Sequence, residues 1–243
     1  VLVLPEGRVK LLDFGTAKVS DPVENITREG EFIGTFAYAS PEQLMNHPVD
    51  GRSDLYSLGV EVPQVGIGLR RPDTASSILA HSPSGKVPAL LVGDRLVWDS
   101  LAILEYLAED HPSLWPHDRA ARTHARCIAA EMHSSFQALR QSCPMDFLAW
   151  SPKTGLADDV QADIRRIVAL WREARGRHGG DGPFLYGGFT AADAMFAPVV
   201  SRFASYVPDL VPYGDDGTAA AYVAMMMATP EMQAWGAGAR AEA

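Results

Sequence analysis

The sequence predicts an α/β region followed by an all-α region. The stretch SPSGKVPALLVGDRLVWDSLAILEYLA, residues 82–108, contains in succession a loop, a strand, a tight turn, a second strand and a helix start. From Asp118 onward strand signals vanish and apolar residues recur at helical spacing. With 243 residues, of which 47% are hydrophobic, the chain is long enough for two medium-sized domains with substantial cores.

The chain opens with a predicted hairpin, which is followed by three short motifs. The apolar runs Val1 to Leu4 and Val9 to Leu12 are separated by turn residues. Then follow D-F-G at 13–15, G-T-x-x-Y-x-S-P-E at 34–42 and D-x-Y-S-x-G at 54–59. In this order and spacing, the three motifs resemble the activation segment of a bacterial-type protein Ser/Thr kinase.

The kinase resemblance implies a role for Asp13 as a magnesium ligand on nucleotide phosphates. In that family the Gly-rich loop, the nucleotide-binding lysine and the catalytic loop would all precede the residue that is Val1 here. We expect the true beginning of the chain to lie upstream of Val1. The helices that complete the lower lobe do not follow Val60. Because phosphoryl transfer needs several parts positioned together, we expect residues 1–60 to be a kinase fragment without kinase activity, in which Asp13 is vestigial.

A second pattern begins at about residue 61, without a linker. Val62 to Leu69 is a predicted strand and Thr74 to Ala80 a predicted short helix. Leu90 to Val92 and Leu96 to Trp98 are predicted as the strands of a hairpin, since Gly93-Asp94 between them is a turn dipeptide. Both patterns are cut inside what should be their cores, whereas natural fusions join domains through exposed linkers.

The hairpin leads directly into a predicted helix. Asp99 and Ser100 are good helix caps, and Leu101, Leu104 and Leu107 follow at helical spacing. The unpaired N–H groups at a helix start favour anions, so this position is suited to a carboxylate ligand.

From G-K-V-P-A-L to the acidic-Ser pair, the chain resembles the cytosolic glutathione transferases of bacteria. In that family the proline of this loop is cis, and the backbone of the preceding residue pairs with the cysteinyl part of glutathione. The resemblance therefore implies a glutathione site made of five residues: Lys86, Val87, Pro88, Asp99 and Ser100. Ser100 would hold the γ-glutamyl carboxylate, Asp99 would help to fix the γ-glutamyl amine, and Lys86 would lie near the glycyl carboxylate.

The same resemblance implies three domains. These are a kinase fragment at 1–60, a truncated thioredoxin-like domain at 61–111 and an all-helical transferase domain at 112–243. The first strand and helix of the thioredoxin-like domain are not recognisable in the sequence. In the family that piece carries the residue that activates the sulfur of glutathione, so no residue here is assigned that role.

The helical region contains five predicted segments. Asp118 to about Leu148 is one long helix or a broken pair, Asp158 to Arg177 is a second, and Thr190-x-x-Asp193 is a capping box that opens a buried third. Tyr222 to Ala228 and Glu231 to Ala239 are two closing helices.

Met132 and Phe136 allow two interpretations. By the resemblance, both would face the hydrophobic co-substrate pocket, which in the family is lined from the first long helix. The alternative, which we prefer, is that both side chains simply fill the core.

Charge and cysteine content limit the possible partners. The net charge of −9 argues against nucleic acid or an anionic membrane as the main partner. Cys127 and Cys143 stand in helical sequence, no spacing suggests a metal site, and no apolar run spans a bilayer. We therefore expect a cytoplasmic protein that has no functional metal and forms a homodimer, as the family usually does.

These observations favour a glutathione transferase-like protein that binds glutathione and conjugates it to an electrophilic small molecule, with impaired activity. Three alternatives stay open: a non-catalytic glutathione-binding or dimerisation module, a recombined product of two cut domains without a selected function, and a Ser/Thr kinase remnant. The last would need parts that the sequence does not show.

Overall fold

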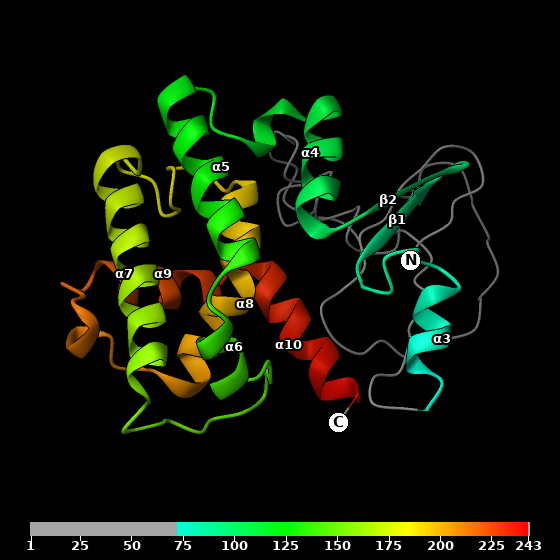
Figure 1. Cartoon of the computed structure of the whole chain (residues 1–243). Coiled ribbons are helices and arrows are strands. Elements are labelled where there is room, and N and C mark those ends of the chain that lie inside the picture. Colours follow the sequence, from blue (N-terminus) through cyan, green and yellow to red (C-terminus); the bar gives the residue numbers. More distant parts are fainter. Residues whose placement is uncertain (1–71, 243) are drawn as a thin grey trace, which may run out of the picture. The chain divides into compact units, whose positions relative to one another are not determined.

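The computed structural model describes residues 72–242, which fall into two compact units that divide after Leu107 (Figure 1). The predicted opening hairpin, the kinase-like motifs with Asp13 and the strand predicted at 62–69 lie outside the described residues. In the parts that are described, an α/β unit precedes an all-helical one, as the sequence predicts.

The first unit is built on a two-stranded antiparallel hairpin. Helix α3 (Thr74–Leu79) precedes strands β1 (Ala89–Val92) and β2 (Arg95–Trp98). Gly93 adopts a positive φ of 61° at the turn, which glycine does without strain. The predicted hairpin is therefore confirmed, with each strand one residue longer than expected.

Helix α4 (Ser100–Asp110) follows β2 after a single residue, Asp99. The Asp99 carboxylate accepts a hydrogen bond of 2.9 Å from the Leu101 amide, which caps the helix as predicted. Leu104 and Leu107 of the predicted apolar face are buried, together with Ile103, whereas the predicted Leu101 is only half-buried.

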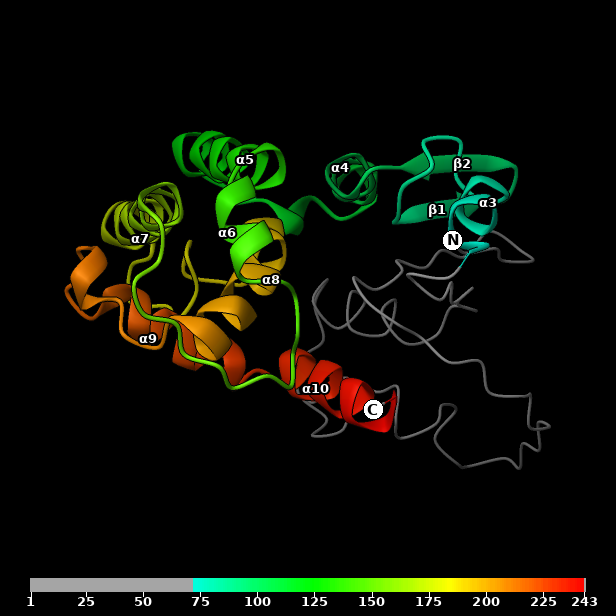
Figure 2. The same ribbon diagram turned by 60° about the horizontal axis from the view of Figure 1, so that its bottom comes forward.

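Among the described residues of the second unit, the regular elements are all helices, and two isolated β-bridges join Phe184 to Gly187 and Tyr186 to Gly188. The helices are η1 (Pro112–Leu114), α5 (Arg119–Ser134), α6 (Gln137–Ser142), α7 (Asp158–His178), α8 (Ala191–Tyr206), η2 (Val211–Tyr213), α9 (Thr218–Met227) and α10 (Pro230–Glu242). Helix α8 packs against α5 and α9, while α7 packs against α5, α6 and α9 (Figure 2).

The region predicted as one long helix or a broken pair is a broken pair. Phe136 interrupts it with a left-handed backbone (φ 64°), and α6 ends at Ser142, six residues before the predicted end at Leu148. Pro144 explains that early end, because proline cannot donate the next helical hydrogen bond and disfavours a helical residue before it.

The core of this unit is aromatic. Trp171 of α7 contacts three other aromatic rings, edge to face with Phe196 (5.6 Å between ring centroids) and Tyr222 (4.9 Å) and in a tilted arrangement with Phe203 (5.3 Å), and all four side chains are buried. Because Phe196 and Phe203 belong to α8 and Tyr222 to α9, this cluster joins three helices.

Helix α9 begins four residues earlier than the sequence analysis expected. Both oxygens of the Asp215 carboxylate accept backbone hydrogen bonds, from Ala219 (2.8 Å) and Ala220 (3.0 Å), and so fix the first turn. The sequence Asp215-Asp216-Gly217 is a helix-start signal, and the prediction that the helix begins at Tyr222 is wrong.

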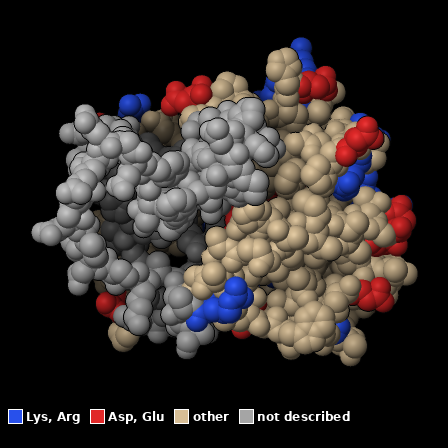
Figure 3. Space-filling model, turned by 180° about the vertical axis from the view of Figure 1, so that it is seen from behind, with Lys and Arg blue, Asp and Glu red and all other residues tan. Residues whose placement is uncertain are grey.

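Charged side chains are unevenly spread over the surface. On the face in Figure 3, lysine, arginine and acidic side chains form small separate groups, and a broad area of other described residues lies between these groups. Within residues 72–242, no helix has the length and apolar character needed to cross a membrane.

Candidate functional site

Strand register brings the two halves of the predicted glutathione site to one end of the hairpin. Ala89 is paired with Trp98 across β1 and β2. Val87 and Pro88 come just before the first of these residues, and Asp99 and Ser100 come just after the second. Paired residues in an antiparallel ladder have Cα atoms only about 4.5–5.5 Å apart. Both segments therefore leave the hairpin side by side, at its open end.

The loop before β1 is ordered by its own hydrogen bonds. The Lys86 amide donates to Ser84 Oγ (3.2 Å), and the hydroxyls of Ser82 and Ser84 lie 3.0 Å apart. The Val87–Pro88 peptide bond is cis, as the resemblance implied. Lys86 and Val87 are exposed, whereas Pro88 is buried. The loop is therefore anchored at Pro88 and presents Lys86 and Val87 to solvent.

The start of α4 supplies the other half of the candidate site. Ser100 is buried and stands at the first helical position, and Asp99 is exposed with a left-handed backbone (φ 79°). Helical N–H groups favour a bound carboxylate here, and the Asp99 carboxylate favours an amine beside it. The pair suits an amino-acid-like group that carries both charges.

Neither cysteine belongs to this site. Cys127 is an exposed residue of α5, and Cys143 is buried just after α6. Burial raises the pKa of the Cys143 thiol, which lowers its reactivity. In the described part of the chain, no cluster of three histidine, cysteine or acidic side chains is arranged to hold a metal ion.

Met132 and Phe136 lie at the junction of α5 and α6. Both are almost fully buried, with exposures of 4% and 5%. The Met132 carbonyl accepts a hydrogen bond of 2.7 Å from the Arg140 guanidinium. Their contact with a co-substrate stays a prediction.

A polar cluster in the helical unit was missed by the sequence analysis. Nδ1 of His124 lies 2.7 Å from the Tyr186 hydroxyl, and its Nε2 lies 3.8 Å from a Glu173 carboxylate oxygen. Burial lowers the pKa of His124 and raises the pKa of Tyr186. These residues come from α5, α7 and the loop before α8, and no local motif links positions so distant in sequence.

The two units define a class of protein: a thioredoxin-like N-terminal domain followed by an all-helical C-terminal domain. The comparisons with known sequences give this class a family. Residues 54–110 match the model for the N-terminal domain of glutathione S-transferase, and residues 153–235 match the model for its C-terminal domain. The chain therefore has a glutathione S-transferase-like fold, and separate segments of it match the models for the two domains of that family.

A solved structure supports the same fold. Glutathione S-transferase 1-6 from Anopheles dirus species B superimposes with a TM-score of 0.54 at 16% sequence identity, covering 73% of this chain and 84% of that one. At this identity the likeness concerns the fold alone.

Curated relatives are bacterial kinases. Serine/threonine-protein kinase Pkn1 of Myxococcus xanthus is 41% identical over 183 residues, which cover 71% of this chain and 24% of the kinase. PknA of Mycobacterium tuberculosis is 45% identical over 60 residues, 25% of this chain and 14% of the kinase. The chain spans about a quarter of the length of the first kinases that it matches. This similarity supports the kinase fragment that the motifs predict.

Proposed function

We propose that this chain binds glutathione at the open end of the β1–β2 hairpin and belongs functionally with the glutathione transferases. The observation that carries the proposal is the pairing of Ala89 with Trp98, because it sets Val87-Pro88 beside Asp99-Ser100 within a segment that matches the transferase N-terminal domain.

Each residue of the candidate site has a distinct task in this proposal. The Val87 backbone pairs with the cysteinyl part of glutathione in the manner of an added strand, and Pro88 shapes the loop that presents it. Ser100, through its hydroxyl and amide, binds the γ-glutamyl carboxylate, and Asp99 pairs with the γ-glutamyl amine. Lys86 attracts the glycyl carboxylate from the exposed side of the loop.

Catalysis requires the glutathione thiol to lose its proton and attack an electrophilic small molecule. No residue of this chain is assigned the task of stabilising the thiolate, so we propose slow conjugation. The electrophile would be held by the helical unit, for which Met132 and Phe136 are the sequence-based candidates. We further propose a homodimer, and the domain bounds 1–60, 61–111 and 112–243.

Thermal unfolding of the whole chain with and without millimolar glutathione tests binding. A ligand that binds only the folded state raises the midpoint, and Ser100→Ala should reduce that rise. Ser134→Ala is the matched control, because Ser134 is an exposed helical serine of the second unit. An unfolding midpoint that glutathione leaves unchanged in the unmutated chain would contradict the proposal.

The competing function is a non-catalytic glutathione-binding module. The two are separated by measuring conjugation of glutathione to a generic electrophile. Turnover that Ser100→Ala lowers favours the enzyme, and binding without turnover favours the module.

The kinase similarity makes a remnant of a Ser/Thr kinase a second candidate. We propose that it transfers no phosphate, since a magnesium ligand at Asp13 cannot alone position ATP and substrate. Phosphate transfer from ATP that is lost in Asp13→Ala would show the opposite.

A further inference from the structure

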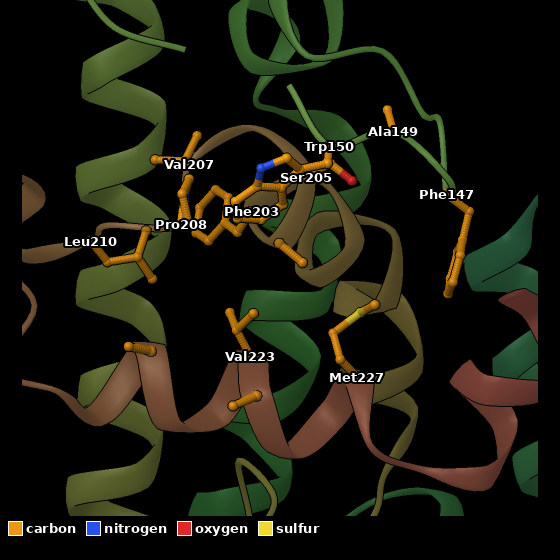
Figure 4. A pocket seen from close by; sticks show the side chains of 13 residues that line it. Phe147, Ala149, Trp150, Phe203, Ser205, Val207, Pro208, Leu210, Val223 and Met227 are labelled. Atoms are coloured by element: carbon orange, nitrogen blue, oxygen red, sulfur yellow. The ribbon is translucent and has the colours of Figure 1, made fainter. Parts of the chain in front are cut away.

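The helical unit contains an apolar groove that the proposed function does not use. It lies between the segment 147–150, the end of α8 with the turn that follows it, and α9, and its volume is about 470 Å³. In Figure 4, Val223 and Met227 rise from α9 on one side, and Phe203, Val207 and Pro208 face them from the other.

The wall formed by 147–150 is fixed by hydrogen bonds on both of its flanks. Downstream, the amides of Ser151 and Lys153 donate to the carbonyls of Ser205 (3.0 Å) and Tyr206 (2.9 Å) at the end of α8. Upstream, the Asp146 carboxylate accepts from the amides of Leu148 and Ala149, at 3.1 Å each. The groove is therefore formed before any ligand enters, which lowers the entropic cost of binding.

The chemistry of the lining points to a neutral aromatic occupant. Of the described residues that line the groove, none has an ionisable side chain, and the polar side-chain groups are the Ser205 hydroxyl and the Trp150 indole N–H. Three of the lining residues are aromatic: Phe147, Trp150 and Phe203. A charged ligand would lose hydration here without gaining a counter-charge, whereas a flat ring can stack on these walls.

Several exposed apolar side chains belong to the lining of the groove or are adjacent to it in sequence. Trp150, a lining residue, is 71% exposed, and its sequence neighbour Leu148 is 42% exposed. Val211, next to the lining residue Leu210, is 69% exposed. Half of the exposed large apolar residues of the described chain thus lie in or beside this groove, and a ligand would remove apolar surface from water there.

The volume of the groove, about 470 Å³, suits a small molecule. Pockets for small molecules commonly measure about 300–1,000 Å³, and the groove falls within that range.

We propose that this groove binds a neutral, flat aromatic molecule of two or three rings. The site is formed by residues of the second unit alone, whereas the glutathione site belongs to the first. The inference does not rest on glutathione binding, and the two can fail separately.

The test is a fluorescence titration of the full chain with N-phenyl-1-naphthylamine, a neutral three-ring probe that brightens in apolar surroundings. We expect saturable binding of one probe per chain. Ala224→Phe should weaken it by about tenfold or more, because an aromatic ring on α9 would occupy the groove. Ala221→Phe is the matched control, since Ala221 is also an exposed alanine of α9 but does not line the groove, and it should leave binding unchanged.

Circular dichroism of both variants checks that they fold. If Ala224→Phe fails to fold, Ala220→Phe, which fills the groove one turn earlier, takes its place. Three outcomes overturn the proposal: no saturable binding, equal binding by Ala224→Phe and Ala221→Phe, or displacement of the probe by glutathione. A self-association that Ala224→Phe abolishes, without probe binding, would instead identify the groove as an interface between copies.

Discussion

The Tyr222 hydroxyl donates a hydrogen bond of 3.0 Å to Asp193 Oδ1, and both side chains are buried. The same carboxylate accepts from the amides of Leu185 (3.0 Å) and Thr190 (2.8 Å) and from the Thr190 hydroxyl (2.9 Å). Burial raises the pKa of Asp193, and these hydrogen bonds oppose that rise. One carboxylate thus joins the loop before α8, the first turn of α8, and α9.

Removing either partner of this contact should destabilise the helical unit by different amounts. Tyr222→Phe leaves Asp193 three other donors, so we expect the free energy of unfolding to fall by about 1–2 kcal/mol. Asp193→Ala leaves several buried donors unpaired, and we expect a fall of about 3–5 kcal/mol. Urea unfolding measures both. Tyr213→Phe, in the partly exposed turn η2, is the control, and equal losses in all three variants would contradict this assignment.

Two glycines of α10 should respond oppositely to the same substitution. A Cβ on Gly236 would lie 2.6 Å from Cε1 of Phe147, whose ring packs in a tilted arrangement against Trp235 with 5.1 Å between centroids. A Cβ on Gly238 would meet nothing within 4 Å. Alanine stabilises a helix by about 1 kcal/mol relative to glycine, and overpacking costs about 1–3 kcal/mol. Gly238→Ala should therefore raise the midpoint of thermal unfolding, and Gly236→Ala should lower it. A rise in both would mean that Phe147 moves aside freely.

His124 should make stability depend on pH. The pKa of His124 is lowered in the folded chain chiefly by burial; Glu173 raises it, and the interactions with His178, Arg177 and Arg166 lower it further. The unfolded chain then binds more protons, so stability is complete above the usual histidine pKa of about 6.5 and falls as the pH drops through the folded value.

The measurement is the unfolding midpoint between pH 8 and pH 5 for the unmutated chain and for His124→Gln. We expect a shallower acid loss in the variant. His117→Gln, which changes an exposed histidine before α5, should keep the original slope. If both variants behave alike, His124 is not the group responsible.

The sequence predicted the features that depend on neighbouring residues. Gly93-Asp94 indicated the hairpin, Asp99-Ser100 the start of α4, and Thr190 with Asp193 the capping box that the structure confirms. Each of these signals acts over a few residues, so one stretch of sequence contains all of it.

Features that depend on contacts between distant residues could not be read in this way. The hydrogen bond of Tyr222 to Asp193 and the cluster of His124 with Tyr186 each join separate elements. The groove beside Trp150 is formed by three segments that are distant in sequence, so it can be recognised only once their arrangement in space is known. Phe136 is buried, as the core interpretation predicts, but the sequence does not predict its left-handed backbone, because nothing in its residue type demands that conformation.

A substitution of Asp99 should distinguish the contribution of this residue to stability from its proposed contribution to glutathione binding. Asparagine is as good a helix cap as aspartate and also tolerates the left-handed backbone at φ 79°, so Asp99→Asn should change the free energy of unfolding by less than about 0.5 kcal/mol. It removes the negative charge that we propose to pair with the γ-glutamyl amine. Since a charge-assisted hydrogen bond is roughly twice as strong as a neutral one, glutathione affinity, measured by calorimetric titration, should fall about tenfold. Asp94→Asn, at the exposed hairpin turn, is the control and should leave the glutathione affinity unchanged. If Asp99→Asn also leaves the affinity unchanged, the γ-glutamyl amine does not pair with Asp99.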